Sequence, residues 1–439
     1  MKAERGMKWL LGALLLGAMQ LALAGPAIQH WTTANGMRVY FVPADELPMI
    51  DIRVTFAAGA ARDGDRPGIA SMTSRMLTQG AGGRSADEIA QAFEDVGARI
   101  GTGALRDMSW LSLRSLSDPE YLEPALDAFT RVLWHPDFPE ADFLRNRNQQ
   151  LLGIKAAEAS PGKIASKAFY RAVYGDHPYG SPVEGTKESV EKLTVDDLKA
   201  FHRRYFVARN GVLAITGKLT RAEAEKLAER LSSGLEPGEA APPTPPAPAL
   251  KEPKEIRIPF PSRQAHVYMG HPGIERGNPD YYALYLGNHV LGGGGFTSRL
   301  VKEVRVKRGY VYSVYSYFLP MASQGPFQIA MQTRGSQVDD AIAVSRDTLR
   351  RFMADGPSAE EIEASKKNIT GGFPLRIASN GDIVEYLAVI GFYHLPLDYL
   401  DTFTKEIDAV RAEEIVAAFE RHVHPDSMVT VIVGGGKEE

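Results

Sequence analysis

The feature that most constrains this chain is an internal repeat with an offset of 217 residues. The segment 195–200, Val-Asp-Asp-Leu-Lys-Ala, aligns with Ala-Glu-Glu-Ile-Val-Ala at 412–417, and residues 212–217 align with 429–434 without a gap. Each copy reads as a helix that opens on acidic residues, which suit the positive helix N-terminus, followed by a strand that stops at glycine. A chance match of one helix and one strand is the alternative, but the unbroken register favours a duplicated unit.

A proline-rich segment separates the two copies. Residues 239–253 read E-A-A-P-P-T-P-P-A-P-A-L-K-E-P, which excludes a regular helix or a central strand. We interpret 238–253 as a semi-rigid linker between an N-terminal domain at 25–237 and a C-terminal domain at 254–439. A chain of 439 residues, 44% of them hydrophobic, is long enough for two or three packed domains.

Strand and helix patterns alternate within each half. Residues 38–42, 51–57 and 107–113 have the pattern of strands, whereas 85–96 and 121–135 have the pattern of helices. Adjacent strands mixed with helices predict an α+β fold, with a sheet on one side and helices on the other.

The start of the chain has the pattern of a secretory signal peptide. Basic residues precede an apolar run at 9–22, which ends in Ala-Leu-Ala at 22–24. An uncleaved anchor is the alternative, but the run is short for a span of about 20 residues. No Cys follows the cleavage site, so a lipoprotein is excluded, and no later apolar stretch could cross a bilayer. We expect residues 1–24 to be removed and the mature protein to reside in the periplasm, without a membrane segment.

Charge and cysteine content exclude two further classes. The formal net charge of -4 gives no electrostatic reason to expect a nucleic-acid partner. The chain has no Cys, so disulfides contribute nothing to its stability.

Residues 68–80 read G-I-A-S-M-T-S-R-M-L-T-Q-G and have the pattern of a zinc-binding helix without its zinc-binding side chains. A hydrolytic zinc helix carries two histidines on one face and a glutamate that takes a proton from the bound water. Here Ser71 and Arg75 stand in the histidine positions and Ser74 stands in the glutamate position. Hydroxyls are poor zinc ligands and a guanidinium repels a cation, so we expect no metal on this chain.

The frame around this motif resembles the pitrilysin, insulinase and mitochondrial-processing-peptidase family. The shared elements are a strand at 52–56, a small-residue turn at 57–61, an Arg-Asp pair, the G-I-A…M-L-x-Q-G string and a second helix from Ser85. The resemblance covers about 31–434. It implies two homologous α+β domains, each with a mostly antiparallel sheet, that face each other as a clam shell.

The resemblance also implies a third zinc ligand, a glutamate in a helix similar to residues 146–154. Leu151, Leu152 and Gly153 occupy the positions where it could fall, and none is a carboxylate. Loss of all three ligands and of the base identifies a non-catalytic member.

A second family element is intact in the C-terminal half. Arg305 and Tyr312 lie in the string L-x-x-E-V-R-x-K-R-G-x-x-Y-S-V, similar to the R-x-x-x-x-x-x-Y element that faces the zinc site in the family. The resemblance implies that they hold the substrate backbone and stabilise an oxyanion. A phenol donor and a cationic fork suit that role. The alternative is a helix-surface cation followed by a core aromatic residue.

The remaining motifs have structural interpretations. The glycine run at 292–295 lacks the Gly-Lys-Ser/Thr of a phosphate loop, so we expect a tight, mobile turn. His422 and His424 could hold a metal but have the pattern of exposed polar residues. The Asp-His-Pro-Tyr-Gly loop at 176–180 is expected to be structural. No G-x-S-x-G elbow supports a serine hydrolase.

These observations predict the non-catalytic, substrate-binding subunit of a heteromeric periplasmic zinc metalloendopeptidase. Zinc is then expected in a homologous partner subunit with an intact H-x-x-E-H, and Arg305 and Tyr312 contact the peptide bound there. An alternative from another class is a peptide-binding or scaffold protein without a catalytic partner. A third possibility is a self-sufficient enzyme with unrecognised ligands.

Overall fold

The computed structural model describes residues 27–436, and the predicted signal peptide lies outside the described residues. The first half carries one six-stranded sheet, in the order β1-β2-β8-β3-β7-β6, and a two-stranded ribbon, β4-β5. Its strands are β1 (Gln29–Thr32), β2 (Arg38–Pro43), β3 (Met49–Phe56), β4 (Gly80–Ala81), β5 (Arg84–Ser85), β6 (Arg99–Ala104), β7 (Ser109–Leu116) and β8 (Gly211–Gly217). Its helices are α2 (Ile69–Met76), α3 (Ala86–Glu94), α4 (Pro119–Trp134), α5 (Glu140–Ala157), α6 (Pro161–Tyr174), α7 (Lys187–Glu191), α8 (Val195–Tyr205) and α9 (Arg221–Ser233).

The second half repeats this arrangement with a five-stranded sheet, β11-β12-β10-β13-β9. Its strands are β9 (Lys254–Ile258), β10 (Gln264–Pro272), β11 (Val311–Phe318), β12 (Pro326–Arg334) and β13 (Val429–Gly434). Its helices are α10 (Tyr281–Asn288), α11 (Val338–Asp355), α12 (Ala359–Gly372), α13 (Asn380–Phe392), α14 (Tyr399–Ala409) and α15 (Ala412–His422), with π-helical turns η4 (His289–Gly293) and η6 (Val301–Val306).

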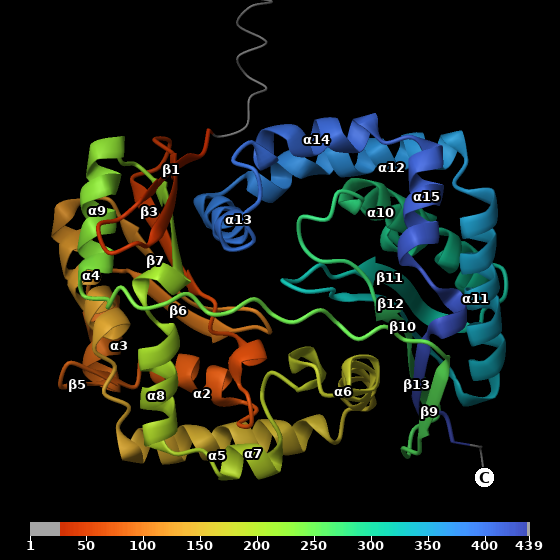
Figure 1. The fold of residues 1–439 in the computed structure, drawn as a ribbon, viewed down its shortest axis with the longest axis horizontal. Helices are drawn as coiled ribbons and strands as arrows, with labels where there is room; N and C mark the ends of the chain where they lie inside the picture. Colours follow the sequence, from red (N-terminus) through yellow and green to blue (C-terminus); the bar gives the residue numbers. More distant parts are fainter. Residues whose placement is uncertain (1–26, 437–439) are drawn as a thin grey trace, which may run out of the picture.

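The two sheets have the same strand order, because β2, β8, β3, β7 and β6 correspond in turn to β9, β13, β10, β12 and β11. Each sheet has one parallel pair, β2 with β8 and β9 with β13, and its other pairs are antiparallel. The predicted α+β duplication with mostly antiparallel sheets is therefore confirmed, and the two halves face each other as a clam shell (Figure 1).

Most predicted elements lie within a few residues of the observed ones. The helix expected at 85–96 is α3, which Ser85 caps in a reciprocal capping box with Glu88. The repeated helices are α8 and α15, and both open on acidic residues as expected.

Strand alternation gives each sheet two buried faces. In β2, Val39 and Phe41 point into the core under the helices of the first half. Tyr40 and Val42 point the other way and join the core of the second half. A sheet with two apolar faces needs a second cover, which the fold provides by an exchange of helices.

One helix from each half packs on the sheet of the other half. Helix α6 lies against β10 and β13 of the C-terminal sheet, whereas α13 lies against β2, β3 and β8 of the N-terminal sheet (Figure 1). The repeat offset maps α6 onto α13, so the exchanged helices are equivalent copies. Helices therefore cover both faces of each sheet, although only one covered face was expected. Each half completes its core only with a helix from the other.

The proline-rich segment crosses between the halves as an extended strap (Figure 1). Ala241 N donates to Asn210 Oδ1 over 2.8 Å, and Ala247 N donates to Gln324 Oε1 over 2.9 Å. The strap is therefore tied to both halves.

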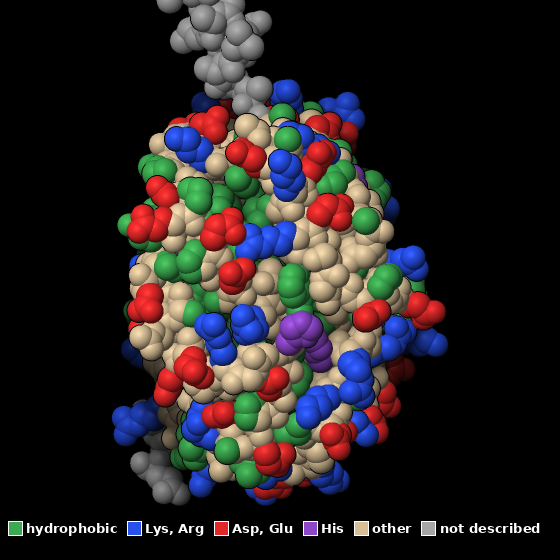
Figure 2. All heavy atoms as spheres, turned by 90° about the vertical axis from the view of Figure 1, so that its left-hand side faces the viewer, with side chains coloured by type: hydrophobic (Ala, Val, Ile, Leu, Met, Phe, Trp, Pro, Cys, Tyr) green, Lys and Arg blue, Asp and Glu red, His purple; other side chains and the backbone are tan. Residues whose placement is uncertain are grey.

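The outer surface of the N-terminal half carries basic and acidic side chains interspersed (Figure 2). Within the described residues, no helix combines the length and the apolar character needed to cross a membrane.

Candidate functional site

The degenerate motif lies on α2, whose start is held by Asp63. Gly68 N and Ala70 N donate to the two carboxylate oxygens of Asp63 over 2.6 and 3.1 Å. Burial raises the pKa of this carboxyl to about 8, although two amide donors favour its charged form. Gly68 has a φ of 98°, which a residue with a side chain rarely adopts. These contacts fix the direction in which α2 presents its side chains.

The three degenerate positions have different environments. Ser74 is 1% exposed, and its hydroxyl has no hydrogen-bond partner among the described residues. Ser71 is half-buried, and Arg75 is exposed and lines a cavity. Two hydroxyls and a guanidinium do not fit zinc, because zinc prefers imidazole, thiolate and carboxylate donors.

Helix α5 faces the motif with glutamines. Gln149, Gln150 and Gly153 line the same cavity as Arg75. Leu151 packs against the core, and Leu152 is 67% exposed to solvent. Of the three positions expected for the third ligand, only Gly153 lies on the cavity wall, and it has no side chain to bind a metal.

Gln150 is fixed by its surroundings, and the sequence reasoning missed it. Its amide nitrogen donates to Glu184 O over 2.8 Å and lies 3.5 Å from Gly68 O. Its Oε1 is buried without a partner among the described residues. Its position four residues after the buried Asn146 could have indicated that it faces inward, because i and i+4 share one helix face.

The cavity lies between the halves and has a volume of about 1120 Å³. The first half contributes residues of α2, α5 and α6, and the second half contributes the turn after β11 and residues of α13. One wall carries the pair of Arg53 with Glu385, whose atoms lie 3.4 Å apart. Arg53 also lies over the ring of Trp110, at 4.5 Å from its centroid. A pocket of this size with mixed apolar and charged walls is typical of a binding site.

Asp107 joins the halves at the edge of this cavity. It accepts from the Tyr179 phenol over 2.6 Å and from Ala322 N over 2.8 Å. Burial, followed by the nearby Asp107 charge, raises the pKa of Tyr179 above its usual range, so the phenol stays protonated as a donor.

Arg305 and Tyr312 lie together but outside the cavity wall. The guanidinium carbon of Arg305 is 5.7 Å from the centroid of the Tyr312 ring and 5.0 Å from that of Phe296. Tyr312 is 73% exposed at the start of β11, an edge strand of its sheet. Leu319, on the cavity wall, follows seven residues later, which corresponds to roughly 20 Å along a strand. Arg305 and Tyr312 therefore lie close to each other, but neither lines the cavity that Arg75 lines.

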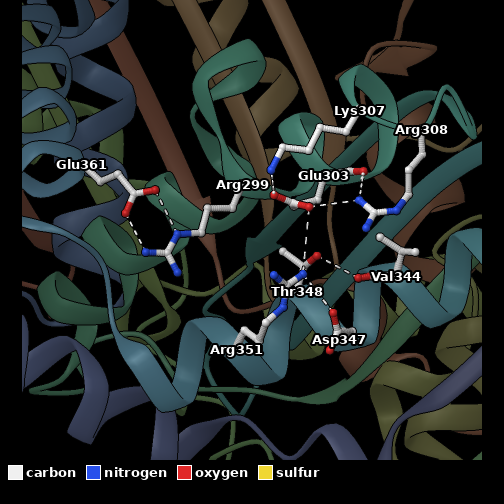
Figure 3. Close-up of polar contacts among 9 residues, drawn as sticks. All are labelled: Arg299, Glu303, Lys307, Arg308, Val344, Asp347, Thr348, Arg351 and Glu361. Carbon is white, nitrogen blue, oxygen red and sulfur yellow. Dashed lines mark hydrogen bonds and ion pairs between the residues drawn. The ribbon is translucent and has the colours of Figure 1, made fainter.

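Three of the cations close to Arg305 in the sequence pair with acidic residues, as Figure 3 shows. Arg299 binds Glu361 through two hydrogen bonds of 2.9 and 2.6 Å, and this pair lowers the pKa of Glu361 to about 2. Lys307 and Arg308 both pair with Glu303, at 2.6 and 3.0 Å. Within residues 27–436, Arg305 has no acidic partner, and its guanidinium lies near the rings of Phe296 and Tyr312. Its charge is therefore available to an external group.

The glycine run lies in helical turns and packs against β11. Residues 289–293 continue α10 as the π-helical turn η4. A Cβ on Gly292 would lie 2.3 Å from Ser316 Oγ, so this glycine is required for close packing on β11.

The two candidate histidines have separate structural roles. His422 Nε2 lies 2.8 Å from Asp280 Oδ2, whereas the backbone N–H of His424 donates to His271 over 3.0 Å. Among the described residues, no group of three or more His, Cys, Asp or Glu side chains is placed to hold a metal ion.

The loop at 176–180 is structural, as expected. His177 Nε2 bonds to Pro245 O over 2.8 Å and thereby ties the loop to the linker.

Comparisons with known proteins identify the family of this chain. Residues 44–187 match the family described as insulinase (peptidase family M16), and residues 192–369 match the peptidase M16 inactive domain. An uncharacterized zinc protease of Streptomyces coelicolor is 30% identical over 81% of this chain and 79% of the relative. A protein of Helicobacter pylori described as the non-peptidase homolog YmxG is 25% identical over 99% of this chain and 100% of the relative.

A solved structure has the same fold. The crystal structure of a peptidase M16 inactive domain from Pseudomonas fluorescens superposes with a TM-score of 0.90 at 41% identity, and covers 94% of this chain and 99% of that one. The names of these relatives include both a protease and a non-peptidase. The side chains at the zinc-ligand positions on α2 and α5 cannot bind zinc, which agrees with the description as a non-peptidase. The chain therefore belongs to the insulinase family, peptidase family M16, as an inactive, peptidase-like homologue.

Proposed function

We propose that this chain is the non-catalytic, substrate-binding subunit of a heteromeric zinc metalloendopeptidase. The observation that carries the proposal is the pairing of an unneutralised cation, Arg305, with an exposed phenol, Tyr312, in a chain whose own metal positions cannot bind zinc. A phenol donor and a guanidinium can stabilise an oxyanion and hold a peptide carbonyl.

The place of the pair supports a role toward another subunit. Tyr312 is the second residue of β11, an edge strand whose free backbone groups can pair with an extended peptide or with a partner. In this proposal the partner is a homologous chain with an intact H-x-x-E-H that holds the zinc, and the N-terminal signal directs this chain to the periplasm.

Reconstitution tests the proposal. The mature chain is purified alone and together with a homologous zinc subunit, and peptide cleavage is measured for wild type and for Tyr312→Phe. We expect the chain to be inert alone, and turnover of the complex to fall by about tenfold to a thousandfold in the variant.

Tyr315→Phe is the matched control. It removes another exposed phenol of β11, one that stacks on Tyr317. Unchanged turnover in Tyr312→Phe, or equal loss in both variants, would refute the role of Tyr312.

A binding protein without a catalytic partner is the second candidate, and the cavity favours it. This cavity lies within one chain and is lined by both halves, so it could hold a peptide unaided. Under this alternative, peptide binding does not change when Arg305 and Tyr312 are both replaced.

A further inference from the structure

The cavity between the halves has an excess of positive charge, although the whole chain has a net charge of -4. Seven of its lining residues are basic and four are acidic. An excess of one sign of charge on cavity walls, next to low-dielectric protein, concentrates ligands of the opposite sign.

The local ion pairs do not remove this excess. Glu385 is paired with Arg53, and the oxygens of Asp107 accept from tyrosines and a backbone amide. Glu158 and Glu184 are the remaining acids on the wall. The lining cations without an acidic partner, within the described part of the chain, are Arg75, Arg106, Lys163, Lys167 and Arg276.

Three of these cations form two groups on different helices. Arg75 comes from α2, at a position where the zinc enzymes of the family carry a ligand. Lys163 and Lys167 are four residues apart on α6, so they share one face of that helix. All three are exposed toward the cavity and can reorient toward a ligand.

The other walls of the cavity offer apolar contacts. The apolar walls, which include Ile164, Val183 and Val389, suit aliphatic side chains of the same ligand.

We infer that this cavity binds an acidic peptide, with Arg75 holding a carboxylate. The position of a lost metal ligand thus serves anion recognition. The choice of a peptide rests on the proposed function, but the site belongs to this chain alone and requires no partner.

Fluorescence anisotropy with the full mature chain tests the inference. The probes are a labelled flexible peptide with a run of glutamates, its glutamine counterpart and its lysine counterpart. We expect the glutamate peptide to bind at least about tenfold more tightly than the glutamine peptide, with an affinity that falls as salt is added. The lysine peptide should bind more weakly than both.

The variants localise the site. Arg75→Gln is expected to weaken binding of the glutamate peptide by about tenfold to a hundredfold, the range for a hydrogen bond to a charged group. The double variant Lys163→Gln/Lys167→Gln should weaken it as well. Arg84→Gln removes an equal charge from an exposed position outside the cavity, and its affinity should stay within about twofold.

A neutral peptide, as free acid and as amide, identifies which carboxylate is held. Binding of the free acid alone would assign the chain terminus, and binding of the glutamate peptide alone would assign side chains. Equal affinity for the glutamate and glutamine peptides, or equal effects of Arg75→Gln and Arg84→Gln, would overturn the inference. The turnover of Tyr312→Phe is a separate measurement, so the proposed function can stand or fail independently.

Discussion

Tyr393 donates its phenolic hydrogen to Asp107 Oδ2 over 2.9 Å, and this bond joins the end of α13 to the turn between β6 and β7. The two residues lie in different halves of the duplicated chain. Ser323 N donates to the Tyr179 phenol, which itself donates to Asp107. One buried carboxylate thus organises contacts from both halves at the edge of the cavity.

Removal of the Tyr393 hydroxyl should destabilise the protein. We expect Tyr393→Phe to lower the free energy of unfolding by about 1–3 kcal/mol, because Asp107 loses one of its buried donors. Urea denaturation measures this change. Tyr312→Phe is the control, since its exposed phenol should change stability by less than about 0.5 kcal/mol. Equal stability of Tyr393→Phe and wild type would show that the bond contributes nothing.

A Gly→Ala substitution is expected to change stability in opposite directions in α13, which packs on the sheet of the other half, and in α5. A Cβ on Gly391 of α13 would lie 2.5 Å from the Tyr40 ring and 2.6 Å from Val212. Overpacking by Gly391→Ala should therefore lower the free energy of unfolding by about 1–3 kcal/mol. The higher helix propensity of Ala offsets roughly 1 kcal/mol of this loss. In α5, nothing lies within 4 Å of a Cβ on Gly153, so Gly153→Ala should stabilise by about 0.5–1 kcal/mol. Thermal unfolding of both variants checks the two signs, and stabilisation by Gly391→Ala would contradict the close packing of α13.

His271 predicts a loss of stability in mild acid. Burial lowers its pKa to about 4, and its Nε2 accepts from His424 N, which a protonated ring could not do. Because the unfolded ring titrates near 6.5, this contribution is complete above pH 6.5 and disappears as the pH falls to 4. The full effect is on the order of 3 kcal/mol.

His271→Gln isolates this effect, because it keeps an acceptor but cannot titrate. The measurement is the free energy of unfolding of both proteins between pH 7 and pH 4. The buried His202, with a pKa lowered to about 4, contributes the same slope to both proteins and cancels. Parallel pH profiles would rule out His271 as the titrating group.

The side chains on α2 and α5 at the zinc-ligand positions predict that the purified chain carries no stoichiometric zinc. A metal that binds only the folded state raises the melting temperature, so added zinc or a chelator should leave that temperature unchanged. Elemental analysis and thermal melts provide the measurement. Bound zinc together with peptidase activity in the isolated chain would overturn the non-catalytic assignment.

Local sequence patterns predicted the repeated units and the absence of zinc ligands. The duplication appears as an unbroken register of side-chain types, and strands and helices follow from periodicity, since both depend on residues close in sequence. The replacement of zinc ligands by Ser71 and Arg75 is a matter of side-chain chemistry at fixed helical spacing, which needs no tertiary information.

The sequence did not predict which residues of α5 face α2. The family resemblance pointed to Leu151, Leu152 and Gly153, but the rotation of α5 against α2 turns Leu152 to solvent and Gln150 inward. Likewise, the sequence has five basic residues at 299–308, and only folding pairs three of them with acids and leaves Lys302 and Arg305 without an acidic partner among residues 27–436.

The sequence by itself determined that the chain is a duplicated α+β protein of the insulinase family without its zinc ligands. Tertiary structure alone decided that α6 and α13 exchange sheets, that Asp107 joins the halves, and that cations without an acidic partner among residues 27–436 line the cavity between them. The physical reason is that secondary structure and ligand chemistry depend on near neighbours in the chain. Helix exchange, burial and ion pairing depend instead on contacts between residues far apart in sequence, which exist only in the folded protein.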